Sequence, residues 1–166
     1  SNPFNKLFYE KYNLRIRLIY QENPGLWLAR NNAILDSDEE IIALLDDDTR
    51  IENDWISKHL KCLDYFNADV SAGISISSYG SKIPENYSYY RIADQFDTGN
   101  AVLHRYVFKK CGLFDERYEG MRKGDAEFGL RTLKNGFLSI SNPEAKRLHL
   151  NLITSSLPIQ LLLNKT

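Results

Sequence analysis

The chain has 166 residues, enough to bury a core within one compact domain. Its formal net charge at pH 7 is −1 and its lysines and arginines are scattered, which argues against a nucleic-acid-binding protein. The two cysteines, Cys62 and Cys111, are too few and too far apart to predict a disulfide framework or a Cys-based metal site, so we expect core thiols. No apolar run is long enough to cross a bilayer, and we expect no transmembrane segment.

The spacing of apolar residues predicts helices that alternate with strands. Asn53 is the expected N-cap of one helix, and Gly136 is the expected stop of another. Residues 78–91 are polar and rich in tyrosine, which predicts a loop. The alternation favours an α/β domain with a mostly parallel central sheet flanked by helices. In chain order the predicted elements are a helix over 2–13, a strand over 14–20, a helix over 23–37, a strand over 40–46, a helix over 53–66, a strand over 69–77, a strand over 96–105, a helix over 123–137 and a strand over 145–151.

The sequence EIIALLDDDTR, residues 40–50, leads an apolar strand straight into three adjacent carboxylates. Like charges this close cost free energy unless a cation offsets them. Ligands of open α/β sheets bind beyond the carboxyl ends of strands, which is where Asp46–Asp48 should lie. The triplet therefore indicates a Mg²⁺ or Mn²⁺ site for a phosphorylated ligand or, with equal weight, a solvated turn. An EF-hand is excluded, because its sixth loop position requires glycine and Ile51 stands there.

Asp125 and His149 are the other candidate functional residues. Asp125 follows a glycine at the start of a predicted helix, where the helix dipole favours its ionised form. Glu127 and Arg131 have the spacing of an ion pair along the same helix. Taken alone, these residues are better explained by a helix cap and a surface pair. A lone histidine on a strand is likewise more often a packed or exposed residue than a ligand.

Taken together and in order, four stretches resemble the family 2 glycosyltransferases, which have the GT-A nucleotide-sugar fold. Each stretch is modestly specific, but four in the right order with the right gaps are highly specific. RKGDAEFGLR and SNPEAKRLHL look most like a bacterial subset of that family. The four stretches are ENPGLWLARNNAI (22–34), IIALLDDDTRIENDWI (41–56), FDTGNAVLHRYVFKKCGLFDERY (96–118) and GDAEFGLRTLKNGF (124–137).

The resemblance implies a role for each candidate residue. Asp48, the last acid of the triplet, would bind a Mn²⁺ or Mg²⁺ ion held by the donor diphosphate, and His149 would complete that metal site. Asp125 would be the catalytic base, although the family usually has a glutamate where this chain has Gly124. Either Asp46 or Asp47 would reach the donor ribose, and a glycine turn beside the sugar pocket would let the substrate approach the backbone. The nucleotide-sugar-binding residues implied in this way are Asp46, Asp47, Arg30, Gly99 and Asn100.

The implied reaction moves a sugar from a UDP- or GDP-linked donor to an acceptor hydroxyl with inversion, in glycan or polysaccharide synthesis. A cation would stabilise the leaving diphosphate and a carboxylate would take the acceptor proton. A glycan or lipid-linked acceptor is expected to contact Tyr87, Tyr89 and Glu127, since flat aromatic faces suit sugar rings. The tyrosines could equally pack their loop onto the domain. We expect a cytoplasmic protein, for which the inner face of the membrane is one option.

The family domain normally begins with a strand, a helix and a second strand that hold the nucleotide base, and this chain starts at the following helix. The resemblance therefore predicts a partial, N-terminally truncated GT-A domain over 1–151 and a C-terminal tail over 152–166. Two alternatives remain open. One is a non-catalytic GT-A-like module, and the other is a metal-dependent phosphohydrolase or nucleotidyltransferase, which also uses clustered acids.

Overall fold

The computed structural model describes residues 19–77, 88–121 and 123–150. Among the helices of these residues, none combines the length and the apolar character needed to span a bilayer. The predicted helix over 2–13, most of the strand over 14–20, most of the loop over 78–91 and the tail over 152–166 lie outside the described residues. The elements are α2 (Leu26–Asp36), β1 (Ile41–Leu45), β2 (Thr49–Ile51), α3 (Trp55–Phe66), β3 (Val70–Ser77), β4 (Arg91–Ile92), β5 (Asn100–His104), α4 (Arg105–Cys111), the 3₁₀ helix η2 (Glu116–Tyr118), α5 (Gly124–Lys134) and β6 (Ser139–His149).

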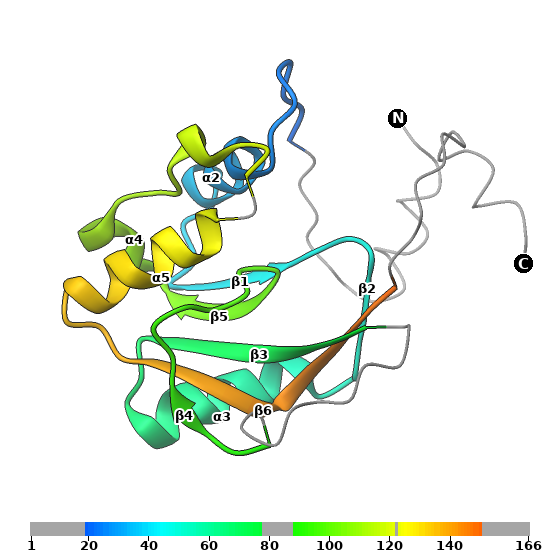
Figure 1. Cartoon of the computed structure of the whole chain (residues 1–166), viewed down its shortest axis with the longest axis vertical. Helices are drawn as coiled ribbons and strands as arrows, with labels where there is room; N and C mark the ends of the chain where they lie inside the picture. The colour runs from blue at the N-terminus through cyan, green and yellow to red at the C-terminus, as the bar shows by residue number, and fades with distance from the viewer. Residues whose placement is uncertain (1–18, 78–87, 122, 151–166) are drawn as a thin grey trace, which may run out of the picture.

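Within this part of the chain, the strands form one mixed sheet in the order β1-β5-β3-β6-β2, and β4 also pairs with β6 (Figure 1). Of the strand pairs described, β3–β6 is parallel, whereas β1–β5, β3–β5, β2–β6 and β4–β6 are antiparallel. The prediction of a mostly parallel sheet is therefore wrong. Alternating helices and strands give parallel pairs only where a helix returns the chain to the same edge. Strand β5 instead lies between β1 and β3 and runs against both.

The strand directions bring three segments to one edge of the sheet. Strands β1, β3 and β6 run the same way, and β5 runs against them. At this edge Leu45, the last residue of β1, pairs with Asn100, the first residue of β5. His149, the last residue of β6, pairs there with Thr49 of β2. The acidic triplet, the turn before β5 and the end of β6 are therefore neighbours, although they are far apart in sequence.

Helices cover both faces of the sheet, with α2, α4 and α5 on one side and α3 on the other (Figure 1). Strand β5 contributes to both layers, because its side chains alternate between the two faces. Ala101 and Leu103 pack beneath α2, α4 and α5, whereas Val102 packs against α3. Each residue of β5 from Asn100 to Leu103 is accordingly fully buried.

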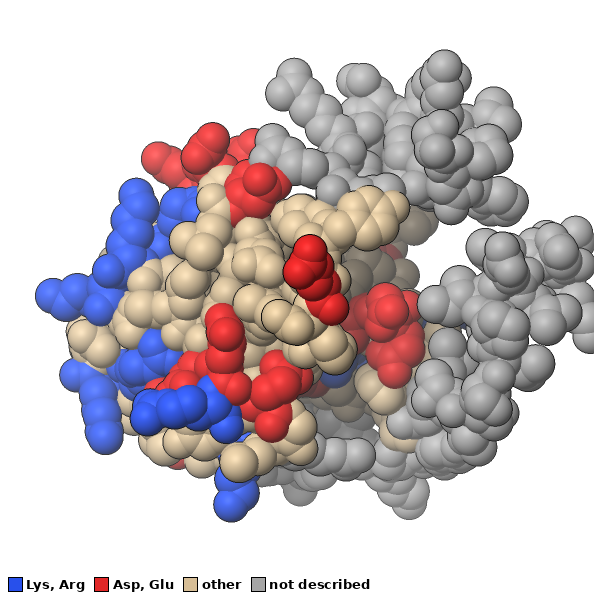
Figure 2. Space-filling model, turned by 90° about the horizontal axis from the view of Figure 1, so that it is seen from above, with Lys and Arg blue, Asp and Glu red and all other residues tan. Residues whose placement is uncertain are grey.

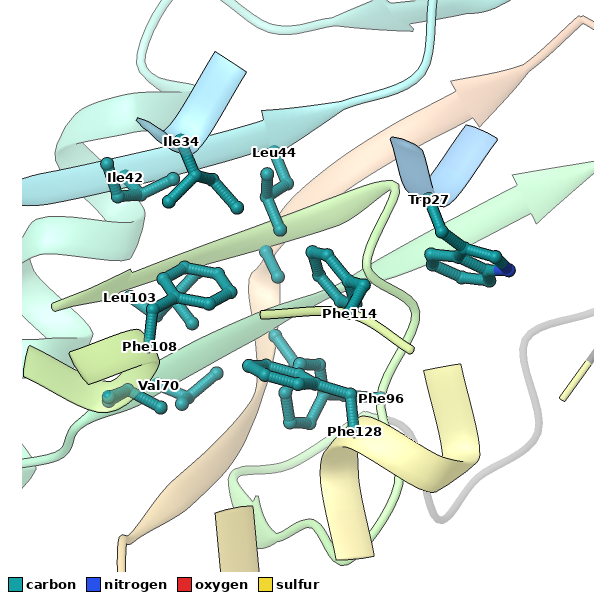
Figure 3. Packing of buried hydrophobic residues seen from close by; sticks show 13 residues of the cluster. Trp27, Ile34, Ile42, Leu44, Val70, Phe96, Leu103, Phe108, Phe114 and Phe128 are labelled. Atoms are coloured by element: carbon teal, nitrogen blue, oxygen red, sulfur yellow. The ribbon is translucent and has the colours of Figure 1, made fainter. Parts of the chain in front are cut away.

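An aromatic cluster attaches α5 to the sheet (Figure 3). The ring of Phe128 on α5 lies 4.6 Å from that of Phe114 and 5.1 Å from that of Phe108 on α4, measured between centroids. Phe96, which precedes β5, meets Phe128 edge-on. Burial of several aromatic rings makes this cluster a large stabilising contribution, and such ring pairs add to it. It fixes the position of the first turn of α5, which carries Asp125.

Several boundaries differ from the predictions. Helix α3 begins after Asp54, whose carbonyl accepts a hydrogen bond from the backbone N–H of Lys58, so the predicted Asn53 N-cap is wrong. The Gly136 stop is confirmed, since α5 ends at Lys134 and Gly136 has φ 82°. Strand β6 begins at Ser139, six residues earlier than predicted. Helix α4 has only seven residues, too few to produce a clear helical period.

Strand β1 is buried mainly on one face. Ile42 and Leu44 face the core, whereas Leu45 is 41% exposed and Ile41 is partly buried against the cluster under α3. Both cysteines are free, as expected for core thiols. Cys62 lies on the buried face of α3, and Cys111 is half-buried against the aromatic cluster.

A buried polar network underlies the amino end of β5. The Asn100 amide donates to the carbonyls of Ile74 and Ala145, at the point where the β3–β6 register shifts after Gly73. Its oxygen accepts from the Trp55 indole N–H at 2.8 Å. The irregular β-ladder leaves backbone carbonyls that need partners, and Asn100 supplies them. His59 is fully buried in the same network, with Nδ1 2.8 Å from the Ser71 hydroxyl.

Lowering the pH from 6.5 to 4 should reduce the free energy of unfolding through His59. Burial lowers the pKa of His59 from 6.5 to about 4, against the opposing effect of its bonds to Asn100 and Ser71. Between these pH values the unfolded chain binds a proton that the folded chain does not. Above pH 6.5 protonation of His59 therefore takes nothing from the free energy of unfolding. That free energy falls by about 3 kcal/mol as the pH approaches 4. Urea denaturation between pH 4 and 7 measures it, and His59→Gln should flatten the dependence. An unchanged slope in that variant would assign the acid sensitivity to other groups.

Candidate active site

A pocket of about 510 Å³ opens at the edge of the sheet where β1, β5 and β6 meet. It is lined by side chains from α2, from the ends of β1 and β6, from the turn before β5 and from the start of α5. Asp47, Asp48, Asp125 and His149 were expected to converge on one cleft; of these four, Asp125 and His149 line this pocket, and Asp46 lines it as well. The ionisable side chains that line the pocket are Arg30, Asp46, Asp97, Glu119, Asp125, Arg147 and His149.

Asp46 lies between two guanidinium groups. Arg30 donates from Nη2 to Oδ1 at 2.7 Å, and Arg147 donates from Nη1 to Oδ2 at 2.7 Å. Burial alone would raise the pKa of Asp46, but the bonds and charges of Arg147 and Arg30 outweigh burial and hold that pKa below its ordinary value. Both carboxylate oxygens are therefore occupied by protein. A direct bond from Asp46 to a ribose would have to displace or share one of these arginines.

Gly99 allows this ion pair to sit against the backbone. A Cβ atom at Gly99 would lie 2.0 Å from Oδ2 of Asp46 and 2.6 Å from Nη1 of Arg147, well inside contact distance. The space left by the missing side chain is thus filled by protein groups. The Asn100 side chain, expected beside the sugar pocket, points instead into the core network described above and is fully buried.

Arg147 organises this edge and was not singled out in the sequence. Its side chain is only 5% exposed. Besides Asp46, it donates to the Gly99 carbonyl at 2.8 Å, to Oδ2 of Asp97 at 2.6 Å and to the Ser75 hydroxyl at 2.6 Å. Strands β1, β3 and β6 and the turn before β5 are therefore held by one side chain. Arg147 lies two residues before His149, so strand alternation places both on one face, a signal that could have identified it.

Asp125 is the second residue of α5 and is held by the turn before β5. The hydroxyl and the backbone N–H of Thr98 both donate to its Oδ1, the latter at 3.2 Å. Arg30 donates from Nη1 to the same Thr98 hydroxyl and lies 3.8 Å from Oδ1 of Asp125. Burial raises the pKa of Asp125 above its ordinary value, against the lowering effect of the Thr98 bonds. The helix start was expected to favour the ionised form of this carboxyl, but burial has the larger effect on its pKa.

Trp27 explains why glycine precedes Asp125. A Cβ atom at Gly124 would lie 2.3 Å from the Trp27 indole ring, so a side chain there cannot coexist with this tryptophan position. The indole N–H of Trp27 donates to the Tyr118 carbonyl at 3.1 Å. Glu119 accepts bonds from the backbone N–H groups of Leu26 and Trp27 at 2.8 and 3.0 Å and thereby caps α2. These contacts join the start of α2 to the segment before α5.

Asp48 and His149 form a pair beside the pocket. His149 Nε2 lies 3.2 Å from Oδ2 of Asp48, and each side chain is about one third exposed, at 32% and 31%. The Leu150 backbone N–H also donates to the Asp48 carbonyl at 2.9 Å, which fixes the chain after β6 against the triplet. Among the described residues, three His, Cys, Asp or Glu side chains do not gather as a metal cluster. One carboxylate and one imidazole nevertheless fit a Mn²⁺ or Mg²⁺ ion whose remaining ligands are phosphate oxygens and water.

The other predicted residues lie elsewhere. Asp47 is exposed and does not line this pocket. Tyr89 lines a different pocket of about 590 Å³, together with Lys58 and Glu144, and Tyr87 falls outside the described residues. Glu127 binds Arg131 through both carboxylate oxygens at 2.8 and 2.7 Å, which confirms the expected pair along α5.

Carboxylates outnumber cations in the pocket. In the view from above, acidic side chains lie at the top, in the middle and toward the right, whereas lysines and arginines lie mainly on the left (Figure 2). Both guanidinium groups of the pocket are already bonded to carboxylates. Among the described side chains that line the pocket, the carboxylates are Asp46, Asp97, Glu119 and Asp125, and the guanidinium groups are those of Arg30 and Arg147. Neither arginine is therefore left over to bind an anionic ligand.

Comparison with known proteins gives a family and a fold. Residues 7–119 match the family model described as Glycosyl transferase family 2. A comparison with curated proteins gives no significant match. S. aureus TarS 1–349 is similar in structure, with a TM-score of 0.66 and 16% identity over 90% of this chain and 48% of that chain. TarS in complex with UDP-GlcNAc matches with a TM-score of 0.63 and 17% identity, over 89% and 46% of the two chains. GalNAc-T7 with UDP, GalNAc and Mn²⁺ has a TM-score of 0.69 and 12% identity, over 90% and 36%.

These structural likenesses show a GT-A-type α/β fold, which agrees with the fold that the resemblance implied. The chain spans about half the length of the TarS structures and about a third of that of GalNAc-T7. The family match covers well over half of the chain and includes the acidic triplet and the Gly99 turn, but it ends before Asp125 and His149. On the strength of this match, the chain belongs to glycosyl transferase family 2.

Proposed function

We propose that the intact protein transfers a sugar from a nucleoside-diphosphate donor to an acceptor hydroxyl, with a divalent cation and with inversion at the sugar carbon. The observation that carries the proposal is the shared pocket. The pocket at the carboxyl edge of the sheet is lined by both Asp125 and His149. Asp125 is a half-buried carboxyl with a raised pKa, and His149 contacts Asp48. Ligands of α/β sheets bind at such an edge.

The charges in the pocket support the need for a cation. A diphosphate would enter a space where four carboxylates face two arginines that are already paired. Its own negative charge would be repelled unless a cation accompanied it. Asp48 and His149 would hold that cation, which neutralises the diphosphate and makes it a better leaving group.

The base chemistry rests on Asp125. As the acceptor oxygen forms its bond to the sugar carbon, the acceptor proton moves to the Asp125 carboxylate. The bond between that carbon and the diphosphate oxygen breaks, and the nucleoside diphosphate leaves with the electron pair. Attack from the side opposite the leaving group inverts the carbon. Burial raises the pKa of Asp125 toward the range where a carboxylate both stays ionised and accepts a proton well.

We propose a uridine nucleotide as the donor. The support is that TarS structures contain UDP or UDP-GlcNAc and that the GalNAc-T7 structure contains UDP and Mn²⁺. For the acceptor we propose a glycan or lipid-linked hydroxyl, as the family resemblance implies. The phosphohydrolase or nucleotidyltransferase alternative loses weight, because the chain belongs to glycosyl transferase family 2.

Asp48→Asn should weaken Mn²⁺-dependent binding of UDP by about tenfold or more. The change removes one of the two protein ligands proposed for the cation and one negative charge. Calorimetric titration of the intact protein with UDP, in Mn²⁺ and in EDTA, measures the effect without an acceptor. Asp64→Asn is the matched control, because Asp64 is an exposed acid on α3, on the opposite face of the sheet. UDP binding that is equally tight in EDTA would overturn the cation site.

A further inference from the structure

Thr98 occupies the position between Arg30 and Asp125 and is fully buried. A threonine hydroxyl has one proton to donate and accepts through its lone pairs. Arg30 can only donate, so its bond to the hydroxyl uses a lone pair and leaves the proton for another partner. That partner is Oδ1 of Asp125. The direction of both hydrogen bonds is thus fixed by the chemistry of the three groups.

The two oxygens of the Asp125 carboxylate are consequently not equivalent. Oδ1 receives the Thr98 hydroxyl and also the Thr98 backbone N–H at 3.2 Å. Among the described residues, Oδ2 receives no hydrogen bond from protein. A carboxylate that is held through one oxygen presents the other to its surroundings in a fixed direction. Oδ2 of Asp125 is therefore the oxygen whose lone pairs can accept a proton.

We propose that Thr98 is the positioning residue for the base, holding Oδ1 of Asp125 so that Oδ2 takes the acceptor proton. The inference rests on the proposed transferase function and adds to it which oxygen reacts and what orients it. It also assigns Arg30 to the support of the base, in addition to its bond with Asp46.

Arg30 is well suited to fix the Thr98 hydroxyl. Its guanidinium carbon lies 5.1 Å from the ring centroid of Trp27 and 5.9 Å from that of Phe114. Its Nη2 is held by Asp46 at 2.7 Å, and its side chain is 12% exposed. A planar cation held by two aromatic rings and a carboxylate has little freedom to turn. A continuous set of bonds therefore runs from Asp46 through Arg30 and Thr98 to Asp125.

The electrostatics of Asp125 agree with this arrangement. Burial raises the pKa of Asp125, the two Thr98 bonds lower it, the charge of Asp97 raises it and that of Arg30 lowers it. Bonds to the ionised form make the carboxylate a weaker base but hold it ready in that form. Loss of the hydroxyl should therefore raise the pKa further and loosen the carboxylate. The other ionisable groups that line the pocket with it are Asp46, Glu119, Arg147 and His149.

The test compares Thr98→Val, which removes the hydroxyl at nearly constant volume, with Thr98→Ser, which keeps it. The first readout is the pH profile of UDP release from UDP-GlcNAc by the intact protein with Mn²⁺, with water in place of the acceptor hydroxyl as the group that takes the sugar and gives its proton to Asp125. In Thr98→Val the acid limb should move to higher pH and kcat should fall roughly 10- to 100-fold, since misplacing a reacting group by about 1 Å can cost about 10²-fold. KM for the donor should stay near that of the wild type, and Thr98→Ser should restore both the limb and the rate.

A second readout does not depend on activity. In protein labelled with ¹³C at aspartate carboxyls, the Asp125 signal is identified by its absence in Asp125→Asn and titrated without substrate. Its midpoint should rise in Thr98→Val and return in Thr98→Ser. Thermal melting checks that each variant is folded. Equal Asp125 midpoints in wild type and Thr98→Val would overturn the positioning role, whatever the enzyme does. A raised midpoint without any UDP release would uphold the contact and overturn the transferase function instead.

Discussion

Asp125→Asn should lower turnover by roughly 10²- to 10⁴-fold while leaving donor binding nearly unchanged. The amide has almost the same shape as the carboxyl but cannot take up the acceptor proton. The Thr98 backbone N–H can still donate to the amide oxygen, so the turn before β5 should keep its place. The expected pattern is therefore a loss in kcat with little change in donor KM, which marks an interaction that acts only in the transition state. The rate of UDP release from UDP-GlcNAc and a calorimetric UDP titration measure the two quantities.

Glu127→Gln is the comparison for this experiment. Glu127 is in the same first turn of α5, but both of its oxygens bind Arg131, and it does not line the pocket. We expect it to keep most of the turnover, with a small loss of stability from the weakened pair. If Asp125→Asn retained turnover and Glu127→Gln lost it, the base would have to be Glu127. A wild-type protein that binds UDP but releases none from the donor would favour a non-catalytic module.

Arg147→Met should destabilise the protein by about 3–5 kcal/mol, which is the usual cost of removing one partner of a buried ion pair. Methionine fills part of the volume but donates no hydrogen bonds. Asp46 would keep only Arg30, Asp97 would lose its cation, and the Gly99 carbonyl would lose a donor. The cost comes mainly from Asp97, whose partly buried charge loses its cation, and from Asp46, which keeps one of its two. Urea denaturation at pH 7 measures it.

Arg117→Met provides a control with the same chemical change. Arg117 also bonds to a carboxylate, that of Asp115, but its side chain is 88% exposed. Exposed pairs of this kind contribute about 0–1 kcal/mol. Similar losses in the two variants would mean that the buried network around Arg147 does not stabilise this edge of the sheet.

Two parts of the site that the sequence predicted lie at the ends of strands, and strand direction brings them together. A triplet of acids after an apolar strand and a histidine at the end of a later strand meet if both strands point the same way, and β1 and β6 do. Asp125 was found through its position at a helix start and through family resemblance. The mostly parallel sheet was a wrong prediction, because chain order does not specify where β5 inserts.

The parts that were missed depend on side-chain contacts between distant segments. The sequence FDTGN does not indicate that Thr98 hydrogen-bonds to Asp125, 27 positions later, or that the missing side chain of Gly99 leaves space for Asp46. Asn100 illustrates the same limit in reverse. It was expected beside the sugar pocket, but the shifted β3–β6 register draws its amide into the core.

The proposed cation and donor sites are tested most directly by locating both ligands in one crystal structure. Crystals of the intact protein grown with UDP and Mn²⁺ should give an anomalous difference peak at the manganese edge beside Asp48 and His149. The diphosphate of UDP should lie between that peak and Asp125 in the 510 Å³ pocket. A manganese peak away from Asp48, or UDP bound instead in the pocket of Lys58 and Tyr89, would contradict the account.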